Sequence, residues 1–241
     1  MQDARPSYPL EAIKFVAGLV AGNKELSTTV DLAAGTGKLT AQLVNYFPNI
    51  TAVEPGDEMR KVFIENLPCV KILKGYAHNI PIKSDSVDAV FIGQAFHWFA
   101  NVESLNEIYR ILKKKGILIL IWNLENNATK WVKEIRELYE KFESDTPQYR
   151  LGQWKNVFNN EGVKLKFSNP YREKSFSFSL KNVARDLVIN RAFSKSYISV
   201  LSDNQKEELK HAINEILDRN GFLDGQTEYP YITDVIYMKK I

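Results

Sequence analysis

The stretch Val30-Asp31-Leu32-Ala33-Ala34-Gly35-Thr36-Gly37-Lys38-Leu39-Thr40 decides the fold of this chain. A short apolar strand carries an acidic residue near its end and runs into a loop of small residues with two glycines. Glycine lets a loop adopt positive φ and lets a ligand approach the backbone closely. A second apolar strand, Ile50 to Glu54, ends in a carboxylate 17 positions after Gly37. Because a carboxylate about 20 residues beyond such a loop binds the ribose hydroxyls of a nucleotide, the stretch predicts a site for an adenosine-containing ligand.

The kind of nucleotide follows from what the loop lacks. A dinucleotide fold requires G-x-G-x-x-G, whose three glycines make room for a pyrophosphate at a helix N-terminus. Here Ala33 stands at the first glycine position, and Leu39 and Thr40 follow the second of the two glycines. The methyl group of Ala33 fits the loop if its backbone φ is negative. Asp31 would repel a pyrophosphate and attract an ammonium group, which favours S-adenosylmethionine over NAD.

At these residues the chain resembles the class I S-adenosylmethionine-dependent methyltransferases with a type 11-like domain, whose first motif is an acidic residue followed by G-x-G-x-G. Two further segments are similar to a subgroup of the small-molecule type. They are Ser86 to Phe99, with the pattern S-V-D-A-V-x-x-x-Q-A-F-H-W-F, and Arg5-Pro6-x-Tyr8-Pro9. The resemblance carries specific motifs from about Arg5 to Asn123. It implies in-line methyl transfer from S-adenosylmethionine to an acceptor that the sequence does not identify.

The resemblance also implies which residues bind the cofactor. Asp31 would accept a hydrogen bond from the methionine ammonium, and Glu54 would bind both ribose hydroxyls. Gln94, at the end of the fourth strand, would be the polar group beside the cofactor. The other expected cofactor contacts are Arg5, Tyr8, Gly35, Thr36, Gly37, Pro55, Met59, Ala77 and His78.

Several of these assignments have alternatives. Arg5 is expected to reach the methionine carboxylate and Tyr8 to close over the cofactor, unless this end of the chain is disordered. Met59 is expected near the adenine or ribose, or else is a core methionine. Ala77 would face the adenine edge, but His78 stands where relatives often carry an acidic residue.

His97 is the candidate catalytic residue. Its ordinary pKa of about 6.5 suits proton removal at neutral pH. The alternative is that His97 and Trp98 only shape the wall of the pocket. Direct methyl transfer needs a base only when the acceptor must first lose a proton, so the enzyme assignment does not depend on this choice.

The alternation of helix and strand patterns through residues 1–122 predicts βαβ units and a parallel sheet. The expected fold is a doubly wound α/β fold: a mostly parallel, seven-stranded Rossmann-like sheet with an antiparallel last strand and a helical cap. Residues 1–123 would bind the cofactor. The stretches 124–172 and 181–228 would be insertions that cap the site and recognise the acceptor, while 173–180 and 229–241 would complete the sheet.

Composition limits the function classes. With 32 basic and 29 acidic residues among 241, the chain is too weakly basic to favour nucleic acid. We interpret Lys113-Lys114-Lys115 as a solvated turn. The single cysteine, Cys69, is expected in the core and excludes an internal disulfide and a cysteine-based metal site, so no metal is expected.

No apolar run approaches the roughly 20 residues that span a bilayer. The first nine residues lack the pattern of a signal peptide. The sequence therefore predicts a cytoplasmic enzyme with a small-molecule acceptor. The alternatives are an RNA- or protein-modifying methyltransferase and a non-catalytic scaffold that binds the cofactor.

Overall fold

A computed structural model describes residues 5–143, 146–168 and 171–241. The chain divides into two compact units, each made of several segments. Unit 1 comprises residues 1–7, 123–146 and 177–233, and unit 2 comprises 8–122, 147–176 and 234–241. In the described part of the chain, no helix is long and apolar enough to cross a membrane.

Seven strands form one sheet in the order β3-β2-β1-β4-β5-β7-β6. Pairing is parallel between β1 and β2, β2 and β3, β1 and β4, and β4 and β5. The strand order reverses direction between β1 and β4, and ligands of open α/β sheets bind outside the carboxyl ends of strands at such a point. The first five strands are β1 (Thr29–Leu32), β2 (Ile50–Val53), β3 (Lys71–Leu73), β4 (Val87–Gly93) and β5 (Leu112–Glu125).

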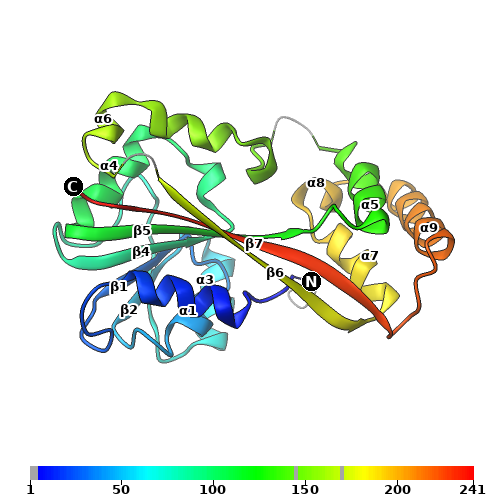
Figure 1. Cartoon of the computed structure of the whole chain (residues 1–241), viewed down its shortest axis with the longest axis horizontal. Helices are drawn as coiled ribbons and strands as arrows, with labels where there is room; N and C mark the ends of the chain where they lie inside the picture. The colour runs from blue at the N-terminus through cyan, green and yellow to red at the C-terminus, as the bar shows by residue number, and fades with distance from the viewer. Residues whose placement is uncertain (1–4, 144–145, 169–170) are drawn as a thin grey trace. The chain divides into compact units, whose positions relative to one another are not determined.

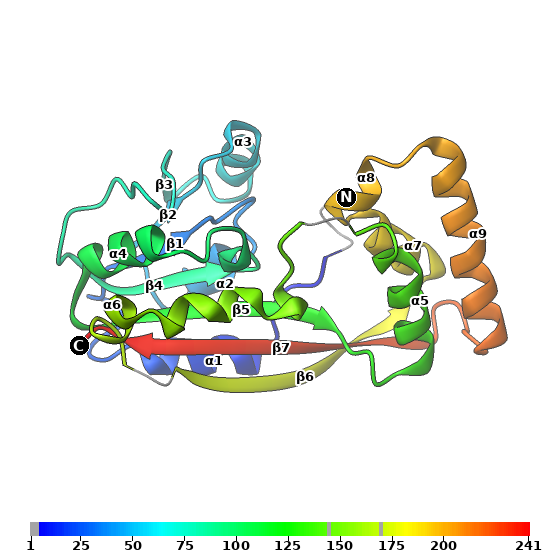
Figure 2. The ribbon, with the colours of Figure 1, turned by 90° about the horizontal axis from the view of Figure 1, so that it is seen from above.

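The last two strands are β6 (Arg172–Val183) and β7 (Thr227–Lys239). Backbone hydrogen bonds join Lys240 to Gly116 (2.8 Å) and Asn126 to Pro230 (2.9 Å), so β7 runs antiparallel to β5. Figure 2 shows β7 between β5 and β6. The predicted mostly parallel sheet of seven strands with an antiparallel last strand is thus confirmed.

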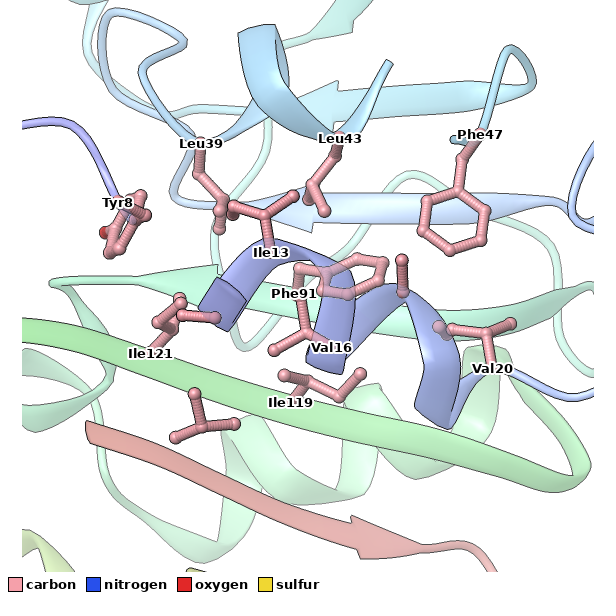
Figure 3. Close-up of a cluster of buried hydrophobic side chains, with 14 of the residues drawn as sticks. Tyr8, Ile13, Val16, Val20, Leu39, Leu43, Phe47, Phe91, Ile119 and Ile121 are labelled. Carbon is pink, nitrogen blue, oxygen red and sulfur yellow. The ribbon is translucent and has the colours of Figure 1, made fainter. Parts of the chain in front are cut away.

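The core of unit 2 lies between the sheet and its first two helices. Alternate residues of β4 and β5 face α1 (Leu10–Leu19) and α2 (Thr40–Leu43), as a strand's period of two requires. Figure 3 shows Phe91, Ile119 and Ile121 against Ile13 and Val16 of α1. In Figure 1, α4 (Val102–Ile111) and α6 (Glu161–Lys164) lie on the side of β4 and β5 opposite α1. The remaining elements of this unit are α3 (Asp57–Asn66), η2 (Phe96–Trp98), η3 (Tyr149–Leu151) and η4 (Gln153–Asn159).

Unit 1 is mainly helical. Its helices are α5 (Lys130–Glu140), α7 (Arg185–Phe193), α8 (Ser196–Ser199) and α9 (Asp203–Arg219). Helix α9 begins at a capping box, in which Ser202 and Gln205 exchange side-chain and backbone hydrogen bonds. Figure 2 shows α5, α7 and α9 close together, and their buried side chains form one hydrophobic cluster.

Two local predictions were wrong. Cys69 is exposed, because it lies in the turn before β3 rather than in the strand. The three lysines are not a free turn but the first part of β5, where Lys113 pairs with Asp88 at 2.9 Å and Lys115 has a φ of 64°. The positive φ and the shift in β4–β5 pairing at this place mark an irregularity within the strand.

Candidate cofactor site and active site

Asp31 lies near the carboxyl end of β1 and is fully buried. Its Oδ2 accepts a 2.5 Å hydrogen bond from the hydroxyl of Thr40, the first residue of α2. Asp31 thus holds the start of α2 through a side-chain hydrogen bond. It lies nine positions before Thr40, which is too far along the chain for an N-cap residue of that helix. Its Oδ1 has no hydrogen-bond partner among the described residues.

Burial raises the pKa of Asp31 to about 7, with the Thr40 hydroxyl opposing the change and the Glu54 carboxylate adding to it. A buried carboxylate with an unpartnered oxygen is costly, because neither water nor protein satisfies it. An ammonium group would both neutralise the charge and donate a hydrogen bond. The ammonium of S-adenosylmethionine therefore fits this position.

Glu54 directly follows β2 and is 8% exposed. Its Oε2 accepts from the backbone amide of Gly35, and its Oε1 accepts from that of Gly56, both at 2.9 Å. Since each carboxylate oxygen has two acceptor positions, both oxygens can also accept from a hydroxyl. Two amides thus fix a carboxylate in the orientation that a pair of ribose hydroxyls requires.

Positive φ angles shape the loop after β1. Gly35 has a φ of 56°, and a Cβ there would meet nothing within 4 Å, so a ligand can approach the backbone. Gly37 has a φ of 87°, and a Cβ there would lie 2.8 Å from Leu67 and 2.9 Å from Phe63. Ala33 has a φ of 58°. The condition under which the Ala33 methyl group would fit without strain, a negative φ, is not met. The residue is in the left-handed conformation that glycine adopts without strain.

Three other residues near this loop are predicted cofactor contacts: Thr36, Pro55 and Met59. The carbonyl of Thr36 accepts from the Asn66 side chain at 3.0 Å, and that of Pro55 accepts from Arg60 at 2.8 Å. Met59 is 50% exposed. This exposure excludes the alternative that Met59 is a core methionine.

The loop after β3 forms a tight turn. Tyr76 and Asn79 make an isolated antiparallel bridge, and the rings of Tyr76 and His78 stack 5.4 Å apart. Ala77 is half-buried and His78 is exposed. A contact of either residue with adenine stays a prediction.

Gln94 directly follows β4 and has a φ of 60°. The backbone amide of Gln94 donates to the Ile121 carbonyl at 2.9 Å, and this bond holds the strained backbone beside β5. Ala33 is strained in the same way at the end of the neighbouring strand β1. Strained backbone of this kind clusters at ligand sites, which supports a site at the carboxyl ends of β1 and β4.

His97 is half-buried in the short helix η2. Its Nδ1 accepts a 3.3 Å hydrogen bond from the indole of Trp122, and burial lowers the pKa of His97 to about 4. The ring is therefore neutral at pH 7, and the tautomer that this bond requires carries its proton on Nε2. Since the unprotonated nitrogen is already occupied, the geometry favours a pocket wall over a general base.

Stacked aromatic rings adjoin His97, and the sequence analysis did not identify two of them. Trp122 stacks on Tyr149 with ring centroids 4.3 Å apart, and Trp154 lies 5.0 Å from Trp122. The Tyr149 hydroxyl donates to Asp234 at 2.9 Å. Because Tyr149 and Trp154 lie in the short 3-10 helices η3 and η4, which have no α-helical or strand repeat, sequence periodicity gave no signal for them.

The N-terminal residues Arg5 and Tyr8 belong to different units. In unit 2, Tyr8 is buried, and a Cβ at Gly93 would lie 2.7 Å from its hydroxyl. Burial, and then the Asp31 charge, raise the pKa of Tyr8, so its hydroxyl stays protonated beside the loop. In unit 1, Arg5 donates to the Ser194 carbonyl at 2.6 Å.

Known methyltransferases are similar to this chain in sequence. The family model of a methyltransferase domain matches residues 30–120. A methyltransferase-like protein of Schizosaccharomyces pombe is 32% identical over 88% of this chain and 81% of its own length. A second methyltransferase of that yeast is 43% identical over 58% of this chain, and the alignment spans 56% of its length.

The fold also matches a solved structure. A protein of Anaeromyxobacter dehalogenans, proposed to be a type II methyltransferase, has a TM-score of 0.70 at 16% identity, with 98% of this chain and 97% of that chain covered. The chain belongs to the class I S-adenosylmethionine-dependent methyltransferases. It is a methyltransferase enzyme with S-adenosylmethionine as its cofactor, which confirms the prediction from the loop after β1.

Proposed function

We propose that this methyltransferase acts on a small-molecule acceptor by direct in-line transfer. A nucleophilic atom of the acceptor forms a bond to the methyl carbon while the carbon–sulfur bond breaks, which leaves S-adenosylhomocysteine. Holding two reactants in line supplies several kcal/mol of the barrier reduction. Positioning rather than a strong base is then what the chain must provide.

The observation that carries the cofactor assignment is the pair of buried carboxylates at the ends of β1 and β2. Asp31 would hold the ammonium through Oδ1, and Glu54 would hold the ribose hydroxyls through two oxygens that backbone amides already orient. Gly35, Thr36, Gly37, Pro55, Met59, Ala77, His78, Gln94, Tyr8 and Arg5 complete the proposed cofactor contacts.

His97 and Trp122 would form one wall of the place where the acceptor meets the methyl group. A neutral imidazole with Nε2 protonated can donate a hydrogen bond to the acceptor and orient it. The near balance of 32 basic and 29 acidic residues supports a small molecule over nucleic acid.

Residues 1–123 would bind the cofactor. The stretches 124–172 and 181–228 would recognise the acceptor, and the stretches 173–180 and 229–241 would complete the sheet. The proposal includes a cytoplasmic location, which rests on the sequence features above and which cell fractionation tests.

Parallel calorimetric titrations with S-adenosylmethionine, S-adenosylhomocysteine and NADH test the cofactor site. We expect both adenosyl ligands to bind and NADH not to bind. Release of S-adenosylhomocysteine in the presence of candidate acceptors then tests turnover. Tight cofactor binding without turnover on any acceptor would favour the scaffold alternative.

A further inference from the structure

Trp122, in β5, is a buried tryptophan whose indole contacts the candidate catalytic residue. It stands one position after Ile121, which faces α1, so its side chain points to the other face of the sheet. There its Nε1 donates to Nδ1 of His97 at 3.3 Å. An indole nitrogen can only donate, so this bond exists only while Nδ1 of His97 carries no proton. Both residues belong to unit 2.

Two other aromatic rings of unit 2 hold the Trp122 ring in place. The ring of Tyr149 stacks on it, with centroids 4.3 Å apart and an interplanar angle of 27°, and the ring of Trp154 lies 5.0 Å away. Tyr149 and Trp154 also stack on each other, with centroids 5.3 Å apart. The Trp154 indole donates to the Tyr149 carbonyl at 2.9 Å. Because closely packed side chains keep one rotamer, the three rings restrict rotation of the Trp122 indole.

A hydrogen bond fixes the far end of Tyr149. Its hydroxyl donates to Oδ2 of Asp234 at 2.9 Å, and Oδ1 of the same carboxylate accepts from the Ser175 hydroxyl at 2.6 Å. Burial, and then the Asp234 charge, raise the pKa of Tyr149, so its hydroxyl stays protonated as a donor. A hydrogen bond to a charged acceptor is stronger than one between neutral groups. Asp234 thus anchors the ring that packs on Trp122.

The tautomer of His97 decides what this residue can do to a bound acceptor. A neutral imidazole has one nitrogen that donates and one that accepts. Burial lowers the pKa of His97 to about 4, so at pH 7 the ring is neutral and only the choice of tautomer is open. While Trp122 occupies Nδ1, the proton is on Nε2 and this nitrogen is a donor. Without that bond both tautomers are available, and Nε2 donates in one and accepts in the other.

We propose that Trp122 is a positioning residue that holds His97 in the tautomer with its proton on Nε2. Tyr149, anchored at Asp234, in turn holds Trp122. The inference rests on the proposed function in one respect, namely that Nε2 of His97 faces the methyl acceptor. The chain then presents one fixed donor to the acceptor rather than a mixture of donor and acceptor.

Simple core packing is the competing explanation. It accounts for the stacked rings but makes the contact between Trp122 and His97 incidental. In that case Trp122→Phe lowers stability through lost volume and leaves the tautomer ratio of His97 unchanged. A spectrum of His97, rather than a stability measurement, therefore distinguishes the two explanations.

The test is proton–nitrogen correlation NMR of the full chain at pH 7, which distinguishes a protonated from an unprotonated ring nitrogen. The chain has three histidines, and the signals that disappear in His97→Ala are those of His97. In the wild type we expect the His97 proton on Nε2. In Trp122→Phe the tautomer ratio should change at least about fivefold towards Nδ1, the factor to which one ordinary hydrogen bond corresponds. The signals of His78 and His211, which are exposed, should be the same in both proteins.

Three further variants keep the test decisive even if Trp122→Phe does not fold. Tyr149→Phe keeps the stacked ring but removes the hydroxyl bound to Asp234, and should change the ratio in the same direction by a smaller factor. Ser175→Ala, the matched control, removes the other hydroxyl from that carboxylate and should leave the ratio unchanged. Ile119→Val removes buried volume from the opposite face of β5. It should lower stability and leave the ratio unchanged.

Three results would overturn the inference. The first is a wild-type His97 with its proton on Nδ1, with both nitrogens protonated or with a mixture of tautomers. The second is an unchanged ratio in folded Trp122→Phe, which would make Trp122 a packing residue only. The third is an unchanged ratio in Tyr149→Phe, which would remove Tyr149 and its anchor from the assignment.

A parallel titration with S-adenosylhomocysteine separates the two proposals. Cofactor binding together with a mixture of tautomers in the wild type would refute only the role of Trp122. The expected tautomer without cofactor binding would refute the cofactor site and leave Trp122 as the residue that sets the tautomer of His97.

Discussion

Asp31→Asn changes the charge of the most deeply buried carboxylate of the cofactor site and little of its shape. Burial raises the pKa of Asp31 from 3.8 to about 7, so the folded protein keeps a proton that the unfolded chain releases above pH 4. Stability from this group is fully present below about pH 4 and is lost as pH rises through 7. A change of roughly three pKa units corresponds to about 4 kcal/mol at most.

Urea unfolding of both proteins from pH 5 to pH 8, without cofactor, measures this effect. The wild type should lose stability as pH rises, by a few kcal/mol over the range. The Asn variant should lack this component and should be the more stable protein at pH 8. The same pH dependence in both proteins would show that Asp31 is ionised at all these values and would refute the argument.

Cofactor affinity should depend on pH in the opposite direction. The ammonium of S-adenosylhomocysteine favours ionised Asp31, so binding below pH 7 releases a proton. The association constant of the wild type should rise up to about tenfold per unit from pH 5 to pH 7. We expect the Asn variant to bind weakly at every pH. Unchanged affinity in calorimetry would remove Asp31 from the ammonium site.

Three other substitutions test the remaining site residues. Glu54→Ala should weaken S-adenosylhomocysteine binding by more than about 1 kcal/mol in calorimetry. The matched control is Glu58→Ala, at an exposed carboxylate, and equal affinity of these two variants would refute the ribose assignment. His97→Ala should leave cofactor affinity unchanged and lower turnover, and equal turnover of wild type and variant would remove His97 from the active site. Because burial lowers the pKa of His97 to about 4, the turnover rate of the wild type should show no inflection from His97 between pH 5 and 8. Ala33→Gly should raise stability by up to about 1 kcal/mol through relief of the positive φ, whereas Ala34→Gly should lower it, and a loss in both would contradict the strain argument.

The sequence predicted the sheet and the site loop because each rests on a short-range pattern. Asp31 and Glu54 each stand at the end of an apolar strand, and the structure joins Glu54 to the loop through the Gly35 amide. The positive φ of Ala33 could not be predicted, since an alanine in the sequence gives no sign of a left-handed backbone. Cys69 was misplaced because its apolar neighbour Val70 resembles the start of a strand.

The buried ion pairs of Glu125 with Arg191 and Lys195 in unit 1 were beyond prediction for a different reason. Arg191 lies 66 positions after Glu125 in the chain. Only the packing of α7 with β5 brings the two together, and no local pattern indicates such packing. A usable signal did exist, because Glu125 follows the apolar run that ends at Trp122, just as Glu54 follows β2.

The position of β7 between β5 and β6 has a consequence for how the protein is made. On the ribosome β7 is the last of the seven strands to emerge, so β5 has an unpaired edge and β6 has no neighbour until residues 227–239 have been made. Exposed edges of this kind invite pairing with other chains. The nascent protein therefore depends on rapid arrival of residues 227–239, and slow translation of that stretch would favour aggregation over assembly of the sheet.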